Sequence, residues 1–235
     1  MSSGLVVAAV TAVLKDLLEN GLVKSAAMSS LGDVIVTALP PDRISVGTDE
    51  RTGLNLFLYQ MTQNRNADWI ARERSRDRYQ SVDNPGSINS PLALNLHYLL
   101  TAYGSKDFQI ELLLGYAMQL LHDTPILTSD TIHTALKHTA AVNTAGIFAQ
   151  ALTTTSITDL IEQLGQIKIS PKFFNTEEMS KLWSVLHSSY RPSITYEVST
   201  VLIEQHLSLE DKMPSVEVMG KRGTSQKSKS KIPNH

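Results

Sequence analysis

Histidine is the residue type in this sequence that is best suited to chemistry, because its imidazole binds metals and exchanges a proton near neutral pH. The 235-residue chain contains seven histidines and no cysteine, so a zinc site would need histidine and carboxylate ligands. Two histidines that share one helix face are about four residues apart, whereas His133 and His138 are separated by five (138 − 133 = 5). No neighbouring residues complete a tetrahedral set. We therefore expect neither a metal nor a cofactor.

A second candidate site surrounds Asn95 and His97, which alternate with leucines in a run of strand-forming residues. A pocket over this pair would make the protein a small-ligand-binding or enzymatic α+β protein. A histidine held by a structural hydrogen bond is the simpler interpretation. The sequence has no Gly-Lys-Ser/Thr phosphate loop and no G-x-S-x-G turn. We therefore predict that the protein is not an enzyme, and we keep the pocket near Asn95 and His97 as the alternative.

The segment 63–90 is long and charged, and we predict that it forms a protein interface. Connections of this length inside a domain are functional or disordered, and its central part, 68–79, has the composition of a short charged helix. Four acidic residues interrupt its five arginines, and the whole chain has a net charge of −2. Because this pattern cancels most attraction to phosphates, we expect no nucleic acid partner. The proposed interface residues are Arg65, Arg72, Arg74, Arg76 and Arg78.

Both ends of the chain differ from its middle. The apolar run at 5–14 lacks a preceding positive charge and is too short to span a bilayer, so it predicts a folded helix rather than a signal peptide. From Gly220 the chain is basic and has little to bury. An adaptor role, in which this tail touches a membrane or nucleic acid, stays open as a third hypothesis. We expect a single domain over 1–210 and a flexible basic tail over 211–235.

The spacing of apolar residues predicts the elements that position these candidates. Alternation at 92–101 predicts a strand, and helical spacing at 110–121 predicts a helix directly after it. The large apolar face of that strand carries Leu92, Leu94, Leu96, Tyr98 and Leu100, and the smaller face carries Ala93, Asn95, His97, Leu99 and Thr101. We expect the remaining elements to pack on this strand and helix.

Further strands are predicted at 34–39, 54–62, 167–170 and 194–205. In strand 54–62 the alternation places Leu54 and Leu58 on one face and Tyr59 and Met61 on the other. In strand 194–205 it predicts one buried face, which includes Ile194, Tyr196, Val198 and Leu202, and one wet face, which includes Thr195, Glu197 and Ser199.

Helices are predicted near both ends of the chain and between the later strands. Asn20-Gly21 is expected to end the first helix, Thr128-Ser129-Asp130 to start one that reaches about His138, and Ser156 to start one that closes at Gly165. Asn175 and Glu178 have the spacing of a capping box. Because helices and strands do not alternate regularly, we predict an α+β fold, with helices packed on a mainly antiparallel or mixed sheet.

Five stretches of this sequence resemble a known family, the cap (tail-terminator) proteins of extracellular contractile injection systems. They are LNLFLYQMTQN at 54–64, PLALNLHYLLTAYG at 91–104, ELLLGYAMQLLHDTPIL at 111–127, EEMSKLWSVL at 177–186 and YRPSITYEVSTVLIE at 190–204. The resemblance covers about residues 5 to 207, and the family's N-terminal domain was formerly of unknown function. None of the five stretches is a catalytic motif.

The resemblance implies a structural role and a fold like that of phage tail terminators. It implies a homohexameric ring at the distal end of the sheath and inner tube, where the ring stops polymerisation. The implied partners are other copies of the chain, the inner tube protein and the sheath protein, with no direct membrane contact. The implied location is a phage tail-like particle that is assembled in the cytoplasm.

Overall fold

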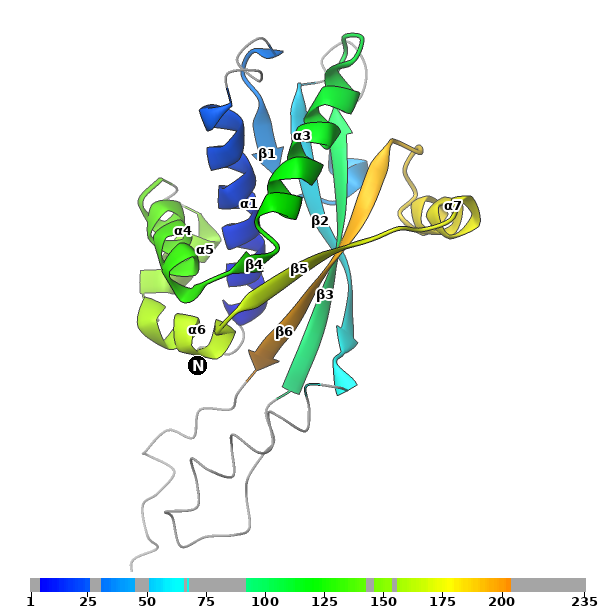
Figure 1. Ribbon diagram of the computed structural model, residues 1–235. Coiled ribbons are helices and arrows are strands. Elements are labelled where there is room, and N and C mark those ends of the chain that lie inside the picture. Colours follow the sequence, from blue (N-terminus) through cyan, green and yellow to red (C-terminus); the bar gives the residue numbers. More distant parts are fainter. Residues whose placement is uncertain are drawn as a thin grey trace, which may run out of the picture.

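A six-stranded mixed sheet with helices packed on it forms the fold in the computed structural model of the chain (Figure 1). The structure describes residues 5–25, 31–44, 51–65, 67, 92–142, 146–153 and 156–203. In chain order its elements are α1 (Val6–Lys24), β1 (Ile35–Thr37), η3 (Pro41–Arg43), β2 (Gly53–Gln63), β3 (Leu92–Tyr103), α3 (Gln109–Asp123), β4 (Ile126–Leu127), α4 (Ser129–Val142), α5 (Ile147–Thr153), α6 (Ile157–Leu164), β5 (Ile167–Lys172), α7 (Thr176–Val185) and β6 (Ser193–Ile203).

Strand β3 lies inside the sheet, whose strand order is β1-β2-β3-β6-β5-β4. It pairs antiparallel with β2 on one side and with β6 on the other, along nearly its whole length. Only β1 and β2 are parallel among these neighbours; the β4–β5 and β5–β6 pairs are antiparallel as well. The predicted α+β class and the predicted strand-and-helix unit are therefore confirmed, with β3 leading into α3 through Gly104.

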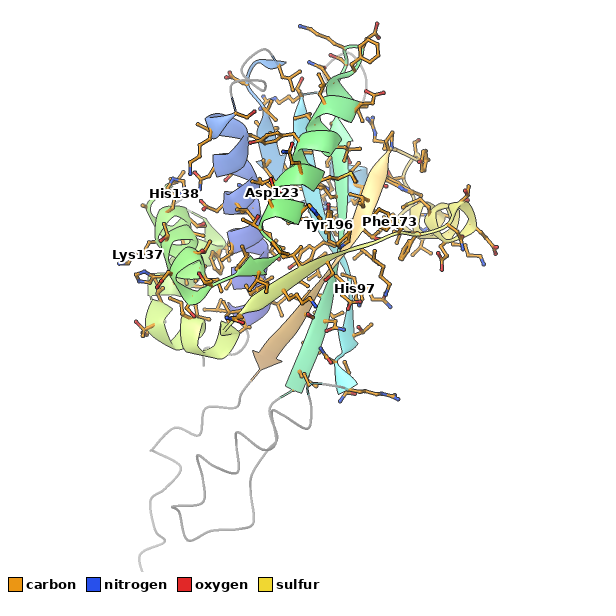
Figure 2. All side chains as sticks on the ribbon, viewed as in Figure 1. His97, Asp123, Lys137, His138, Phe173 and Tyr196 are labelled. Atoms are coloured by element: carbon orange, nitrogen blue, oxygen red, sulfur yellow. The ribbon has the colours of Figure 1, made fainter. Side chains whose placement is uncertain are left out.

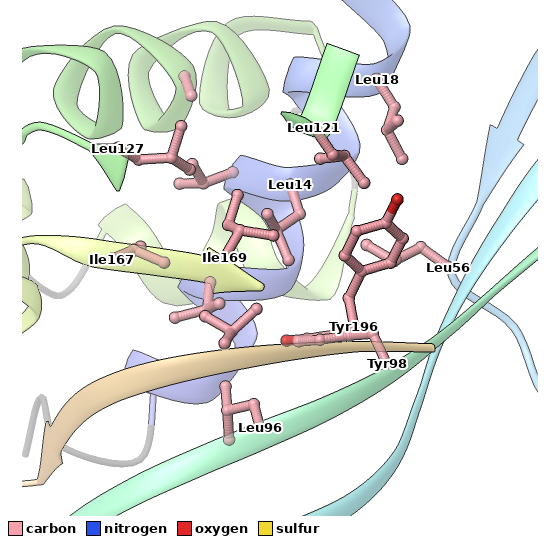
Figure 3. Packing of buried hydrophobic residues seen from close by; sticks show 14 of the residues in the cluster. Leu14, Leu18, Leu56, Leu96, Tyr98, Leu121, Leu127, Ile167, Ile169 and Tyr196 are labelled. Atoms are coloured by element: carbon pink, nitrogen blue, oxygen red, sulfur yellow. The ribbon is translucent and has the colours of Figure 1, made fainter. Parts of the chain in front are cut away.

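The main core lies between the large apolar face of β3 and the helices α1 and α3 (Figure 3). Leu96, Tyr98 and Leu100 of β3 are completely buried there. They meet Leu14 of α1 and Leu121 of α3, which are also buried. Fully burying one such side chain contributes about 2 kcal/mol to folding. Helices α4, α5 and α6 extend this core beside α1 (Figure 1).

Helix α1 does not end at Asn20-Gly21, as the sequence predicted, but continues to Lys24. Gly21 lies inside the helix at the crossing with α3, where a Cβ atom would come 2.3 Å from Cδ2 of Leu120. The Gly21 carbonyl also accepts a hydrogen bond of 2.7 Å from the Tyr116 hydroxyl. This glycine therefore permits close helix packing instead of forming a C-cap.

Two register shifts correct the predicted alternation of β2 and β6. In β2, Leu58 pairs with Tyr98 but Gln60 pairs with His97, so Tyr59 is an extra residue in the strand. After this bulge, Met61 pairs with Leu96 and therefore lies on the large apolar face of the sheet. The prediction that Met61 shares a face with Tyr59 is wrong. In β6, Leu202 pairs with Ala93 of the smaller face, so the predicted alternation of β6 ends at Val198.

The smaller face of the sheet is more deeply buried than predicted. Leu99 and Thr101 are completely buried, and Thr195, which we expected on a wet face, is 1% exposed. Thr195 lies beside β5, where its hydroxyl donates a hydrogen bond to the carbonyl of Lys172. Only Glu197 and Ser199 of the predicted wet face are partly exposed. Both faces of β3 are thus interior surfaces.

The predicted helix starts are largely confirmed. Asn175 accepts from the Glu178 backbone N–H at 2.9 Å, and the Glu178 carboxylate accepts from the Asn175 N–H at 2.9 Å, which completes the capping box of α7. Gly165 closes α6 with a positive φ of 56°. Helix α4 starts at Ser129 as predicted but runs past His138 to Val142. Ser2 and Ser3, the suggested caps of α1, lie outside the described residues.

Candidate functional site

A row of polar side chains crosses four strands on the smaller face of the sheet, and it contains both residues of the alternative pocket. Asn95 of β3 accepts a hydrogen bond of 2.8 Å from Nδ2 of Asn64, and its own Nδ2 donates to Oε1 of Glu197 at 3.3 Å. Oε2 of Glu197 lies 3.4 Å from Nζ of Lys172. Asn95 is thus bonded on both of its polar atoms.

His97, labelled in Figure 2, belongs to the same row and lies between Thr62 and Glu197. Its Nε2 atom lies 2.8 Å from the Thr62 hydroxyl, and its Nδ1 atom lies 3.7 Å from Oε2 of Glu197. Its side chain is also flanked by the Tyr59 ring, with 6.1 Å between ring centroids. Burial lowers the pKa of His97; Glu197 opposes this shift, and Lys172 adds to it. Neutral imidazole is therefore the favoured form.

The order hydroxyl, imidazole, carboxylate in Thr62, His97 and Glu197 is that of a hydrolytic triad. Two observations argue against such chemistry. The Nδ1 to Oε2 separation of 3.7 Å is too long for the hydrogen bond that orients a catalytic base. The three side chains also do not line the cavities of about 270 to 560 Å³ beside β1, α1 and α3 in the described part of the chain. The contacts favour a structural role for Asn95 and His97.

His138, one of the two histidines predicted to be unsuited to metal binding, contacts a carboxylate instead. Nδ1 of His138 lies 2.5 Å from Oδ1 of the buried Asp16, a contact that sequence spacing cannot show because the two residues are 122 positions apart. Within the described ranges, no three His, Asp or Glu residues are grouped so that they could hold a metal ion.

The predicted arginine interface falls mostly outside the described residues. Arg65 follows β2 and is exposed. Arg72, Arg74, Arg76 and Arg78 lie outside the described ranges, as does the predicted helix at 68–79. The interface therefore stays a prediction.

Sequence reasoning missed two exposed apolar regions. One surrounds α7, where Phe173 is 75% exposed and Val185 is 73% exposed. Phe173 also lines a small apolar cavity with Met118 and Tyr196, and both Phe173 and Tyr196 are labelled in Figure 2. The other region is β1 and the residues after it, where Ile35 and Leu39 are exposed, Ile35 lines one cavity and Ala38 lines another. A strand of three residues gives too short a pattern for its edge to be recognised from sequence.

Comparison with known protein families matches residues 9–217 to the family described as the Pvc16 N-terminal domain. That range covers most of the 235 residues. The chain belongs to the Pvc16 N-terminal domain family. The family assignment agrees with the resemblance to cap proteins that the five sequence stretches indicate. It covers every described helix and strand except the first residues of α1.

Two solved structures are similar to this member of the Pvc16 family. One is described as the sheath/tube terminator of an extracellular contractile injection system, PVC, in the extended state. It has 12% identity and a TM-score of 0.42, and the match covers 83% of this chain and 58% of that chain. The other is described as the tube-terminating cap of the anti-feeding prophage. It has 15% identity and a TM-score of 0.42, and the match covers 81% of this chain and 54% of that chain.

This chain therefore spans little more than half the length of the two solved proteins. Comparison with curated proteins gives no match. Among the helices of the described residues, none has the length and apolar character needed to cross a membrane.

Proposed function

We propose that this protein is a cap, or terminator, of a contractile injection system. Its family membership over residues 9–217 is the observation that carries the proposal. In the proposed mechanism, copies of the chain form a homohexameric ring at the distal end of the sheath and inner tube. One side of the ring contacts the last tube and sheath subunits, and the other side offers no surface for further growth.

Two features of the chain are consistent with a structural rather than an enzymatic protein. The polar side chains around His97 are hydrogen-bonded to one another across the strands of the sheet. The exposed apolar side chains near α7 and β1 are of the kind that subunit contacts bury. We infer that the protein is not an enzyme and that it assembles in the cytoplasm as part of a phage tail-like particle.

The test is native mass spectrometry and negative-stain imaging of the full chain, alone and with the inner tube and sheath proteins present. A closed ring of six subunits, located at one end of particles of uniform length, is expected. A head-to-tail contact between copies closes into such a ring when its rotation allows. A chain that stays monomeric at high concentration with both partners present would contradict the proposal.

We infer further that the segment containing Arg65, Arg72, Arg74, Arg76 and Arg78 contacts a neighbouring copy or the sheath. Reversing the charge of Arg72, Arg74 and Arg76 together is expected to reduce cap incorporation and to lengthen particles. Normal length and normal incorporation would eliminate this interface. We also propose that the folded domain ends near residue 210 and that residues 211–235 form a flexible tail.

A further inference from the structure

The outer edge of β1 has the backbone geometry of a strand-docking site. Ile35, Val36 and Thr37 pair in parallel with Gly53, Leu54 and Asn55 of β2, and the Ile35 N–H donates to the Thr52 carbonyl. The Asn55 side chain continues this pairing, since it accepts from the Leu39 N–H at 3.0 Å and donates to the Leu39 carbonyl at 2.9 Å. Alternation along a strand then directs the backbone groups of Val36 and Ala38 away from β2.

On one side of this edge lies a cavity of about 300 Å³, which we call the arginine cavity. Side chains of β1 and the following turn line it, with Leu54 and Tyr103 as further apolar lining. Arg43 and Arg51 also line it and are exposed, and neither forms an ion pair with any other residue in the described part of the chain. This cavity therefore suits an acidic side chain on an apolar stem.

On the other side lies a cavity of about 560 Å³, which we call the alanine cavity. Ala38 borders it after β1, and Ala8 and Ala12 of α1 lie one helical turn apart in its lining. Val142, which is 70% exposed, and Phe148 line it from α4 and α5. Lys15, Asp16, Glu19 and His138 also line the cavity. The small side chains of Ala8 and Ala12 leave room beside Val142 and Phe148 for apolar side chains of medium size.

A strand added to β1 would point alternate side chains into these two cavities. A segment that fits both cavities has one acidic residue, which enters the arginine cavity, with an apolar residue directly before it and another directly after it. Residues 215–219, with the sequence SVEVM, contain this pattern as Val216, Glu217 and Val218. We propose that residues 215–219 of a second copy dock on the β1 edge, with Glu217 at Arg43 and Arg51 and the two valines in the alanine cavity.

The position at which the described chain ends favours a second copy as the donor. β1 joins the sheet beside Gly53, which pairs with Tyr103 at the end of β3, whereas Ile203 pairs with Leu92 at its start. The twelve residues of β3 place these two ends about 36 Å apart. A stretch of thirteen residues from 204 to 216 spans at most about 45 Å. Reaching its own β1 around α1 would need nearly full extension, which is entropically costly.

This inference rests on the proposed ring, in which every copy would donate one segment and receive one. The test uses the absence of native cysteine. Full-length chains with Ala38→Cys are mixed with differently tagged full-length chains carrying Val216→Cys or Val218→Cys, and are oxidised with glutathione disulfide. We expect a disulfide-linked heterodimer with at least one partner, since facing strand residues lie within disulfide distance.

Charge variants test the recognition. Adding Arg43→Glu and Arg51→Glu to the Ala38→Cys chain is expected to slow cross-linking about tenfold, and Glu217→Arg in the partner chain should restore the rate. The control replaces Ala38→Cys by Val23→Cys, a position that is 86% exposed at the end of α1, and it should give no heterodimer. Far-UV circular dichroism confirms that each variant remains folded.

Absence of the heterodimer in folded chains would overturn the inference, as would equal cross-linking at Val23. A doubly substituted chain, with Ala38→Cys and Val218→Cys, that closes within itself upon dilution would also overturn it. Terminal rings that form without the cross-link would leave the proposed function standing and reject only the docking. A cross-link in chains that never form terminal rings would support the docking of residues 215–219 and would contradict the proposed function.

Discussion

Nδ1 of His138 on α4 lies 2.5 Å from Oδ1 of Asp16 on α1. Asp16 is buried, and its second oxygen accepts a hydrogen bond of 2.7 Å from Nδ2 of Asn20. A buried carboxylate is costly unless both of its oxygens find partners. The contact therefore stabilises the packing of α4 on α1, because it gives the buried Asp16 carboxylate a second hydrogen-bond partner.

Replacing His138 by alanine is expected to lower the free energy of unfolding by about 1 kcal/mol, because one Asp16 oxygen loses its partner. The expected loss of unfolding free energy is small because the His138 side chain is 48% exposed, so water can partly replace the lost hydrogen bond to Asp16. Urea unfolding at neutral pH measures the change. Lys137→Ala, at the exposed neighbouring position on α4 (Figure 2), is the control and should stay close to the parent protein. An equal loss in both variants would contradict the role of the contact.

A second link between α1 and the sheet joins the Tyr98 hydroxyl to Oγ1 of Thr11 at 2.8 Å. Tyr98 is completely buried, and burial raises the pKa of its phenol above the ordinary range. Thr11→Val should cost about 1 to 2 kcal/mol, since it leaves a buried hydroxyl without its partner. Tyr98→Phe should cost less, because Oγ1 of Thr11 also donates to the Val7 carbonyl.

The double variant Thr11→Val with Tyr98→Phe is the matched control for this pair. It removes both polar groups, so its loss should be smaller than the sum of the two single losses. Chemical denaturation of all four proteins gives the coupling free energy. Strict additivity would show that the two hydroxyls do not interact in solution.

Two glycine-to-alanine substitutions should change stability in opposite directions. A Cβ atom on Gly53 would lie 2.5 Å from the backbone oxygen of Ile35, so Gly53→Ala should push β1 away from β2 and destabilise the protein. Gly115 lies in α3 with no atom within 4 Å of such a Cβ. Gly115→Ala should therefore raise the free energy of unfolding by about 0.5 to 1 kcal/mol. Thermal melts compare the two variants, and a Gly53→Ala protein as stable as the parent would show that β1 can shift freely.

Acidification should destabilise the fold partly through His97. Burial lowers the pKa of His97 in the folded protein, so the unfolded chain binds the proton more readily. The stability that comes from neutral His97 is present above the unfolded pKa of about 6.5 and is lost as pH falls through it toward the folded value. His97→Gln can keep a hydrogen bond to Thr62 but cannot titrate.

The measurement for His97 is urea unfolding at about pH 7.5 and about pH 5. The parent protein should lose more stability between these two conditions than His97→Gln does. Equal losses would mean that other groups, such as the carboxylates, account for the acid sensitivity. Glu197 and Lys172 are the charged groups that face His97 in the described part of the sheet, and Lys172→Met tests their contribution separately.

Sequence patterns predicted the elements well where one rule governed them. The capping box of Asn175 and Glu178 involves residues three apart, so its geometry is fixed locally. The large apolar face of β3 was predictable because Leu96, Tyr98 and Leu100 follow a period of two. These cases needed no knowledge of distant parts of the chain.

The failed predictions concern contacts between distant segments. The burial of Thr195 depends on β5, and the inclusion of Gly21 in α1 depends on Leu120 of α3. The pairing of Asp16 with His138 likewise joins residues that only the packing of α4 on α1 brings together. In the polar row, Glu197 is shared by side chains from two other strands, and no spacing rule places them. Helix and strand propensities depend on neighbouring residues and therefore cannot predict contacts that form only through tertiary packing.

The extra residue Tyr59 is the position at which β2 can lose a residue and keep its pairing with β3. Its side chain lies against the ring of Phe174, with 6.4 Å between ring centroids, and the register on either side of it differs by one residue. Because Leu58 pairs with Tyr98 and Gln60 pairs with the next residue, His97, deleting Tyr59 would remove the bulge and keep Thr62 beside His97. Deleting a paired residue would instead shift one part of the strand by one position. Natural variation in the length of β2 is therefore expected at Tyr59 rather than at the paired positions.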